Sequence, residues 1–264
     1  MITLVKIGGT LLDAAESRER LAAEIFRAVE DGLQALVVHG GGKQMTRFLA
    51  ERNIDSRFVN GLRVTTPEVL DAVLKVLAGS VNQELVAALV AAGARAVGLS
   101  GMDALITEAR QLSQDLGWVG QPVKSDTRLL ALLMEHGYLP VVACVAGDRA
   151  GRFYNVNADQ MAASIAGAFP AEKLIFLTDV EGVRGPGNNT LESISTAECA
   201  DLIARGIASG GMQAKLEAAS SALRAGVNEV VIAPGARPGV VRALLAGERI
   251  GTKLVSEAGV LKNG

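Results

Sequence analysis

One stretch of the sequence constrains the fold more than any other, because in it a short apolar run ends in three consecutive glycines: Leu36-Val37-Val38-His39-Gly40-Gly41-Gly42. The apolar run predicts a buried strand, and residues 43–52 directly after it predict a helix. Three glycines remove every Cβ from the turn, so the backbone can adopt positive φ and a ligand can approach the amides. A tight strand-to-helix connection would also explain one glycine there, but not three. Since a helix N-terminus favours negative charge, the stretch predicts an anion site.

A second glycine turn follows the first predicted strand, residues 2–7, whose apolar and β-branched side chains are typical of a buried parallel strand. Lys6 interrupts this apolar run directly before Gly8 and Gly9. A position on a sheet edge, or an aliphatic stem that carries the amine to solvent, would explain the lysine without a function. Ligands of open α/β sheets gather at the carboxyl ends of strands, however, so the position favours a ligand-binding role for Lys6.

Strand and helix patterns alternate along almost the whole chain, which predicts an α/β fold with a mostly parallel sheet and helices on both faces. A (β/α)8 barrel is the alternative, and the hairpin-like pattern of residues 104–124 argues against it. The helix predicted at residues 67–92, with a break near Gly79, carries a stripe of four apolar residues. Core packing or a subunit interface would explain that stripe, which consists of Val69, Val73, Val76 and Leu77.

Composition narrows the class of protein further. The 264 residues are 49% hydrophobic, which suits one large α/β domain or two lobes sharing a sheet. The net charge of −2 without a basic block argues against nucleic acid as a partner. Cys144 and Cys199 lie far apart without metal-ligand spacing, as expected in a reducing compartment. A first strand that begins at Ile2 and the lack of an uncharged run of about 20 apolar residues predict a cytoplasmic protein with no membrane contact.

Polar residues cluster at three further places. Asn155, Asn157 and Asp159 alternate with apolar residues just before a predicted helix; one of them would suffice as a cap, so the three predict a polar site. Lys215 follows a glycine pair in the first turn of another helix and is either a second anion ligand or a solvent-exposed lysine. Arg63 lies in a loop among apolar residues, where it fits a carboxylate clamp or a surface salt bridge. A Walker A motif and a G-x-G-x-x-G fingerprint are both missing, which weakens a dinucleotide-binding interpretation.

Taken together, six motifs resemble the amino-acid kinase family in order and spacing along nearly the whole chain: Lys6-Ile7-Gly8-Gly9, the triple glycine, Asn60-Gly61-Leu62-Arg63, Asn155-Val156-Asn157-Ala158-Asp159, Thr178-Asp179-Val180-Glu181-Gly182, and Gly211-Met212 with Lys215. Within the family, the Asn-Gly-Leu-Arg-Val-Thr loop favours the members that phosphorylate N-acetyl-L-glutamate over the carbamate, uridylate and aspartate kinases.

The resemblance implies a three-layer αβα sandwich and a homodimer, with a lobe of about residues 1–170 for the acylated amino acid and dimerisation, and a lobe of about 171–264 for ATP. It implies phosphoryl transfer from MgATP to the γ-carboxylate of N-acetyl-L-glutamate in arginine biosynthesis, with Mg²⁺ held mainly by ATP phosphates and water. A carboxylate is already nucleophilic at neutral pH, so such a reaction needs alignment and charge stabilisation rather than a general base.

The resemblance also assigns roles to residues. Lys6 and Lys215 would bind the transferring phosphoryl group, and Asp159 would hold both lysines. Four residues would bind the acylated amino acid: Gly41, Gly42, Arg63 and Asn155. Eleven would contact the nucleotide: Gly8, Gly9, Asp179, Val180, Glu181, Gly182, Val183, Arg184, Ile207, Ala208 and Ser209. No protein ligand to a metal is expected.

Three other functions stay open at this point. A related kinase could phosphorylate N-succinylglutamate or a carrier-linked aminoadipate. A non-catalytic sensor could share the fold, although the two lysines and Asp159 speak against it, and an NAD-dependent oxidoreductase is disfavoured by the missing fingerprint. Feedback inhibition by arginine in the family is associated with a helix ahead of the first strand. Because the strand begins at Ile2, we expect a dimer, with the stripe from Val69 to Leu77 as part of its interface, and no strong inhibition by arginine.

Overall fold

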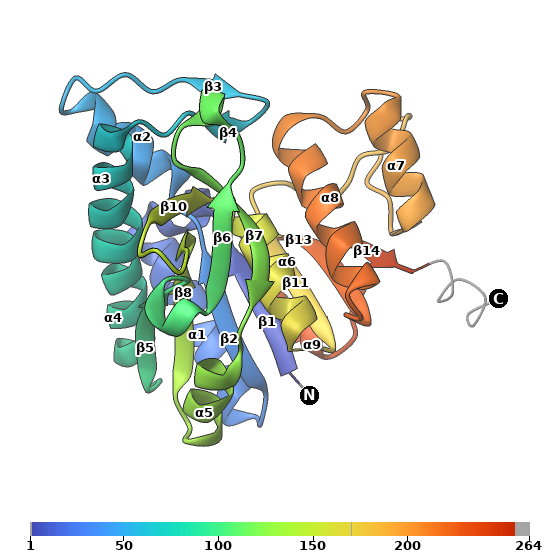
Figure 1. The fold of residues 1–264 in the computed structure, drawn as a ribbon. Coiled ribbons are helices and arrows are strands. Elements are labelled where there is room, and N and C mark those ends of the chain that lie inside the picture. Colours follow the sequence, from blue (N-terminus) through green and yellow to red (C-terminus); the bar gives the residue numbers. More distant parts are fainter. Residues whose placement is uncertain (1, 170, 257–264) are drawn as a thin grey trace.

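An eight-stranded sheet forms the centre of the computed structural model, which describes residues 2–169 and 171–256 (Figure 1). Its strand order is β12-β14-β13-β11-β1-β2-β8-β5, and neighbouring strands are parallel except for the antiparallel pair β13–β14. The bounds are β1 Ile2–Ile7, β2 Gln34–His39, β5 Ala96–Ser100, β8 Leu139–Ala143, β11 Lys173–Thr178, β12 Ser193–Ser195, β13 Glu229–Pro234 and β14 Thr252–Val255. The sheet is open at β12 and β5, so the prediction of a mostly parallel open sheet is confirmed and a (β/α)8 barrel is excluded.

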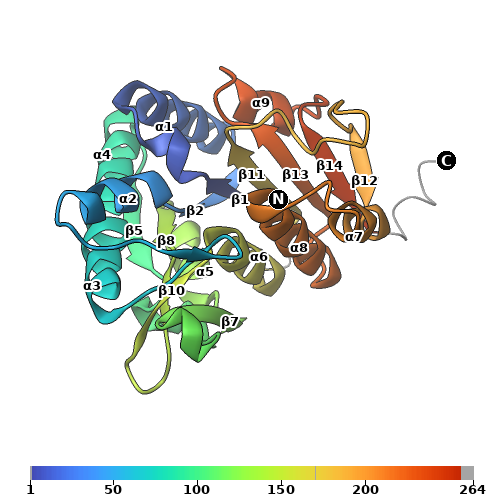
Figure 2. The ribbon, with the colours of Figure 1, turned by 90° about the horizontal axis from the view of Figure 1, so that it is seen from above.

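Helices cover both faces of this sheet, as Figure 2 shows for α1 and α9 on one face and α6 and α8 on the other. The helices are α1 Ala15–Glu30, α2 Gly42–Ala50, α3 Pro67–Lys75, α4 Asn82–Ala92, α5 Arg128–Glu135, α6 Ala158–Ala168, α7 Thr196–Ala204, α8 Gly210–Arg224 and α9 Val240–Leu245. The arrangement is the predicted three-layer αβα sandwich. Central strands such as β1 and β11 are buried on both faces, which is why their sequences are mostly apolar and do not alternate with polar residues.

Two small β-units, a mixed barrel and an antiparallel hairpin, lie apart from the large sheet. Four strands close a small barrel: β6 Thr107–Gln111, β7 Val119–Ser125, β9 Val145–Gly147 and β10 Phe153–Val156. β6 and β7 pair antiparallel, which confirms the hairpin predicted within residues 104–124. A short hairpin, β3 Phe58–Val59 with β4 Leu62–Arg63, crosses the top of the molecule as drawn in Figure 1.

The long apolar helix is interrupted, as its sequence predicts. Thr66 caps α3 by accepting a hydrogen bond from the Val69 amide, and Pro67 occupies the first turn. A π-helical turn, η2 Val76–Val81, joins α3 to α4, and Gly79 within it departs from helical geometry at φ −96° and ψ −106°. Such turns often mark functional sites in helices.

The apolar stripe of this helix is part of the protein's own core. Val69, Val73, Val76 and Leu77 are only 1, 0, 3 and 4% exposed, so the prediction that they form a subunit interface is wrong, whereas core packing is confirmed. Residues 67–92 are long and apolar enough to cross a membrane by length and composition alone. Of their most apolar window, 44% is buried inside the protein.

Candidate active site

The two glycine turns meet at the carboxyl end of β1 and β2. A Cβ on Gly9 would lie 2.8 Å from both the Gly41 Cα and the Gly42 nitrogen, and a Cβ on Gly41 would lie 2.5 Å from the Leu77 Cδ2. Gln44 strengthens this contact by donating from Nε2 to the Gly9 carbonyl oxygen at 3.0 Å. The glycines are therefore needed for close backbone approach.

The triple glycine does not use the positive φ that its residues would permit. None of its three residues adopts a left-handed conformation, and Gly41 has an extended φ of −177° ahead of the first turn of α2. The chain passes from β2 into α2 through extended backbone, so the turn needs space for its neighbours rather than unusual dihedral angles. What the glycines provide is room next to the amides.

A buried ion cluster lies beside these turns and joins three distant segments. The Lys6 Nζ, from β1, is 2.7 Å from the Asp159 Oδ1, and the Lys215 Nζ, from α8, is 3.3 Å from the Asp159 Oδ2. The three side chains are 7, 16 and 6% exposed for Lys6, Lys215 and Asp159. Two cations face one anion, so the cluster carries one excess positive charge in a place where water solvates it poorly. An anionic ligand would balance that charge.

The cluster keeps Asp159 ionised. Burial by itself would raise the pKa of this carboxyl group, but the charges of Lys6 and Lys215 outweigh burial and hold the pKa below its ordinary value of 3.8. The contact of Lys6 with Oδ1 falls short of a well-formed hydrogen bond, so charge attraction dominates it. A carboxylate held in this way is a weak base and an effective anchor for two ammonium groups.

The alternating polar residues ahead of α6 have separate functions. Asn157 is the cap of α6, because its Oδ1 accepts from the amides of Asp159 and Gln160 at 2.9 and 3.2 Å. Asn155 instead donates from Nδ2 to the Thr65 Oγ1 at 3.0 Å. The cap thus accounts for one of the three residues and leaves Asn155 and Asp159 to a polar site.

A cavity of about 220 Å³ opens between the glycine turns, the β3–β4 hairpin and the start of α6. Seven of the residues to which the family resemblance assigns a role line it: Lys6, Gly9, Gly41, Gly42, Arg63, Asn155 and Asp159. Lys215 reaches the same place from α8 through its contact with Asp159. Residues far apart in the sequence are therefore brought together at the position where open α/β sheets bind ligands.

Arg63 forms one wall of this cavity. Its guanidinium group donates to the Ser56 Oγ, to the Thr46 Oγ1 at 2.9 Å and to the Gly42 carbonyl oxygen at 3.2 Å, and it lies 4.5 Å from the Phe58 ring centre. Burial lowers the pKa of Arg63 below its ordinary value, and the group remains a cation because that ordinary value is so high. Within residues 2–169 and 171–256 it makes no ion pair, so the surface salt bridge considered for it is not present.

The residues expected on the nucleotide side lie outside this cavity, with the exception of Gly9. Gly8 donates from its amide to the Leu177 carbonyl oxygen at 3.0 Å, which joins it to the end of β11. After β11, the side chains of Asp179, Val180, Glu181 and Arg184 are exposed. By contrast, Gly182 and Val183 are buried, with the Val183 amide 2.8 Å from the Thr252 Oγ1. Before α8, Ser209 is exposed, Ile207 is half-buried and Ala208 is buried.

Sequence reasoning missed two polar residues that support the site. Asn82, the first residue of α4, is 1% exposed and contacts His39, and Gln44 clamps the Gly9 carbonyl as described above. The signal for Asn82 was its amide, which lies beside Gln83 and Glu84 at the start of a helix that is otherwise apolar. It was not decisive because its partners lie on β2 and β8, far away in the sequence.

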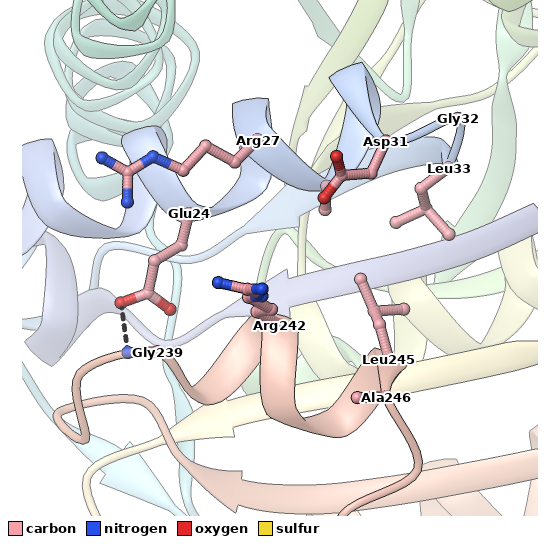
Figure 3. A pocket seen from close by; sticks show the side chains of 10 residues that line it. Glu24, Arg27, Asp31, Gly32, Leu33, Gly239, Arg242, Leu245 and Ala246 are labelled. Atoms are coloured by element: carbon pink, nitrogen blue, oxygen red, sulfur yellow. Dashed lines mark hydrogen bonds between the residues drawn. The ribbon is translucent and has the colours of Figure 1, made fainter.

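A second cavity, of about 520 Å³, shares no residue with the first and lies between α1 and α9 (Figure 3). Glu24 projects from α1 into it and accepts hydrogen bonds from the amides of Gly239 and Val241 at 2.8 and 3.3 Å. Arg20 pairs with the same carboxylate at 2.8 Å and also donates to the Gly235 carbonyl oxygen. These contacts satisfy Glu24 and fasten α1 to the segment that leads into α9.

Comparison with known proteins assigns the class. The sequence model of the amino acid kinase family matches residues 1–234, and the chain therefore belongs to this family.

Individual relatives agree over almost the full length. An acetylglutamate kinase of Solibacter usitatus (strain Ellin6076) is 60% identical over 256 residues, which cover 97% of this chain and 100% of the relative. An acetylglutamate kinase of Koribacter versatilis (strain Ellin345) is 40% identical, covering 97% of this chain and 99% of the relative.

Solved structures share the fold. The N-acetylglutamate synthase of Neisseria gonorrhoeae, complexed with coenzyme A and N-acetyl-glutamate, superposes with a TM-score of 0.86 at 28% identity, over 97% of this chain and 59% of that chain. The carbamate kinase of Giardia lamblia bound to AMP-PNP superposes with a TM-score of 0.75 at 16% identity, over 97% of this chain and 98% of that chain, which speaks for the fold alone.

Proposed function

We propose that this protein transfers the γ-phosphoryl group of ATP to the γ-carboxylate of N-acetyl-L-glutamate, as an acetylglutamate kinase of arginine biosynthesis. The names of the relatives support the substrate, and membership of the kinase family supports the use of ATP. The observation that carries the proposal is the buried Lys6–Asp159–Lys215 cluster beside the glycine turns. It supplies excess positive charge where two anionic reactants would meet.

In the proposed reaction, an oxygen of the γ-carboxylate forms a bond to the γ-phosphorus of ATP. The bond between that phosphorus and the β–γ bridging oxygen breaks, and its electron pair leaves with ADP. No proton has to be removed from the nucleophile, so the chain needs no general base. Lys6 and Lys215 stabilise the charge on the moving phosphoryl group, and Asp159 holds them in place before the reaction starts.

We assign the acylated amino acid to the cavity of about 220 Å³. The amides of Gly41 and Gly42 would receive the reacting carboxylate, and Arg63 would clamp the α-carboxylate with its fork of donors. Its present partners are hydroxyl and carbonyl oxygens, which a carboxylate can replace as a stronger acceptor. Asn155 would complete the polar wall of this subsite.

We assign the nucleotide to the half of the chain from about residue 171 to 264, together with Gly8 and Gly9, and the acylated amino acid to the half before it. Because Val183 and Ala208 are buried, residues 179–184 and 207–209 would contact ATP chiefly through their backbone and through exposed neighbours such as Asp179 and Ser209. Mg²⁺ would neutralise the phosphates and be held by them and by water. Within residues 2–169 and 171–256 no group of three or more His, Cys, Asp or Glu side chains could hold a metal.

We also propose a homodimer that continues the sheet across β5. This strand is an edge of the sheet, all five of its residues are only partly buried, and Val90 on the adjoining α4 is 53% exposed. An open edge next to exposed apolar surface is a template for a second strand. Light scattering would return twice the chain mass of 27.3 kDa, and Val90→Asp should shift it towards the monomer. A monomeric wild type would refute the dimer.

The free thiols of Cys144 and Cys199, both buried, support the further proposal of a cytoplasmic location.

A substrate panel tests the proposed activity. ADP release would be coupled to NADH oxidation with N-acetyl-, N-succinyl- and unmodified glutamate as acceptors, and hydroxylamine would trap the acyl phosphate. We expect kcat/KM to be highest for N-acetyl-L-glutamate. Lys215→Ala should abolish the signal, while the exposed Lys75→Ala serves as a matched control. A preference for N-succinylglutamate would establish a different acyl specificity, and ATP binding without turnover of any acceptor would point to a sensor.

A further inference from the structure

His39 is a buried histidine that the proposed reaction does not use. It ends β2 directly before the triple glycine and is completely inaccessible to solvent. Its Nδ1 lies 3.0 Å from the Gly40 carbonyl oxygen, and its Nε2 lies 3.0 Å from the Asn82 Nδ2. Both ring nitrogens therefore have a partner in the core of the protein.

These partners define the tautomer of the ring. A carbonyl oxygen can only accept, so Nδ1 carries the proton. Nε2 must then accept from the Asn82 amide. The orientation of Asn82 is itself fixed, because the same Nδ2 donates to the Val141 carbonyl oxygen at 3.0 Å. Burial, together with the nearby charge of Lys6, lowers the pKa of His39 from 6.5 to about 4, so the ring is neutral at physiological pH.

The bond to Gly40 acts on the backbone of the glycine turn. In a trans peptide the carbonyl oxygen and the following N–H point in opposite directions. Holding the Gly40 oxygen therefore sets the direction of the Gly41 N–H, which donates to no other group in the described part of the chain. Glycine peptides rotate more freely than others, so this turn would otherwise be free to flip.

The interrupted helix packs against the same glycine turn. Asn82 follows directly on the π-helical turn of residues 76–81, and Leu77 within that turn packs against Gly41. The irregular helix thus reaches the glycine turn twice, through an apolar contact and through the Asn82–His39 pair. An uninterrupted helix would not present both residues in the same way.

We propose that His39 and Asn82 are positioning residues, which together fix the Gly40–Gly41 peptide so that the Gly41 amide donates to the reacting carboxylate of the acylated amino acid. The inference rests on the proposed function for the identity of that carboxylate. It extends the site by two side chains that do not line the cavity. If the pair served packing alone, its loss would lower stability and leave substrate binding unchanged.

The tautomer can be tested without measuring activity, because the chain has only two histidines. Long-range ¹⁵N–¹H spectra of histidine-labelled protein should show His39 as the Nδ1–H tautomer, without titration between pH 6 and 8. The exposed His136 serves as the internal reference. In Asn82→Leu the Nε2 loses its donor while the Gly40 carbonyl oxygen still holds the proton on Nδ1, so the tautomer should persist and the ¹⁵N shift of Nε2 should change. An Nε2–H or doubly protonated His39 in the wild type would overturn the inference.

Two variants separate positioning from packing. Asn at position 39 places an amide near the site of Nδ1, so His39→Asn can still donate to the Gly40 oxygen, whereas the longer side chain of His39→Gln reaches instead towards Asn82. We expect His39→Gln to lower kcat/KM for the acylated amino acid about tenfold or more, by the loss of one hydrogen bond to a charged group. His39→Asn should retain more activity, and KM for ATP should change little in either.

The outcomes separate this inference from the proposed function. Equal kinetic constants in the wild type and both variants, with only lower melting temperatures, would assign the pair to packing and overturn the positioning role. A wild type that phosphorylates no acylated amino acid would overturn the proposed function itself, while the spectrum would still report the tautomer. His136→Gln, at an exposed position, is the matched control and should leave both kinetics and stability unchanged.

Discussion

Replacement of Asp159 by Asn keeps the shape of the side chain and removes the charge that faces both lysines. At an effective dielectric constant of about 20, unit charges 2.7 and 3.3 Å apart attract by about 6 and 5 kcal/mol. Desolvation of the three buried groups offsets much of this attraction, and the loss of one partner from a buried pair typically costs about 3–5 kcal/mol. We expect Asp159→Asn to lower the free energy of unfolding by that amount, because two buried ammonium groups would then face each other.

The nucleotide should rescue part of this loss. Its phosphates carry the negative charge that the variant lacks, so AMP-PNP with Mg²⁺ should raise the melting temperature of Asp159→Asn by more than it raises that of the wild type. In the absence of nucleotide the difference in stability should shrink in acid. The pKa of Asp159 is lowered in the folded state, so its contribution is present above the ordinary pKa of 3.8 and disappears as the pH falls through the folded value.

The kinetic effect distinguishes an anchor from a base. With both lysines displaced, kcat should fall about 100-fold, in the range for loss of a preorganised donor. The pH profile of kcat should keep its shape, because Asp159 is ionised throughout the neutral range. The assays are urea unfolding with and without nucleotide, and initial rates from pH 5.5 to 9. A limb near neutrality that vanishes in the variant would show that Asp159 acts as a base, and unchanged stability would refute the electrostatic reasoning.

Three further predictions follow from the same geometry. Lys6→Ala and Lys215→Ala should each lower kcat far more than they raise KM, because their interaction is strongest in the transition state; near-normal kcat in both variants would remove them from the reaction. Arg63→Lys keeps the charge but loses the fork of donors, so KM for the acylated amino acid should rise about tenfold with KM for ATP unchanged; equal damage to both constants would indicate a structural role. Burial lowers the pKa of His39 from 6.5 to about 4, so its contribution to stability is complete above pH 6.5 and decreases as the pH falls towards 4, by about 3 kcal/mol. The free energy of unfolding in urea should therefore decrease less between pH 7 and pH 5 for His39→Asn than for the wild type. An identical pH dependence in the two proteins would contradict the buried neutral ring.

The large sheet was predictable because its central strands are buried on both faces. Such strands are rich in apolar residues, and β1, β2, β8 and β11 are predominantly apolar, with Lys6 the one charged residue inside β1. The edge strand β12, Ser193–Ser195, escaped prediction because three residues with a single buried side chain leave no period to detect. The same holds for α9, Val240–Leu245, which is shorter than two helical turns.

The candidate site could be predicted from the sequence only in part. Lys6 stood out because a charge inside an apolar strand must have a partner. The sequence could not show how close that partner lies or how many charged groups share it. The stripe of Val69, Val73, Val76 and Leu77 has the same pattern whether it faces another subunit or the chain's own core, and only tertiary structure decides between them. The triple glycine indicated close approach correctly. Its dihedral angles followed from the entry into α2, which no local pattern encodes.

The placement of Asp159 links the stability of the fold to the proposed chemistry. Its two lysines come from β1 and α8, so its ion pairs draw together segments from opposite ends of the chain. The tip of the β3–β4 hairpin also approaches α8 closely, because a Cβ on Gly61 would lie 3.8 Å from the Gly210 carbonyl carbon at the start of α8. Both turns depend on glycine there, with φ of +78° at Gly61 and +54° at Gly210. The acyl phosphate that we propose as product reacts with water, so the site must exclude solvent. The contact between the hairpin tip and α8 would cover the site, and the fixed positive charge of the two lysines would hold two anions together within it.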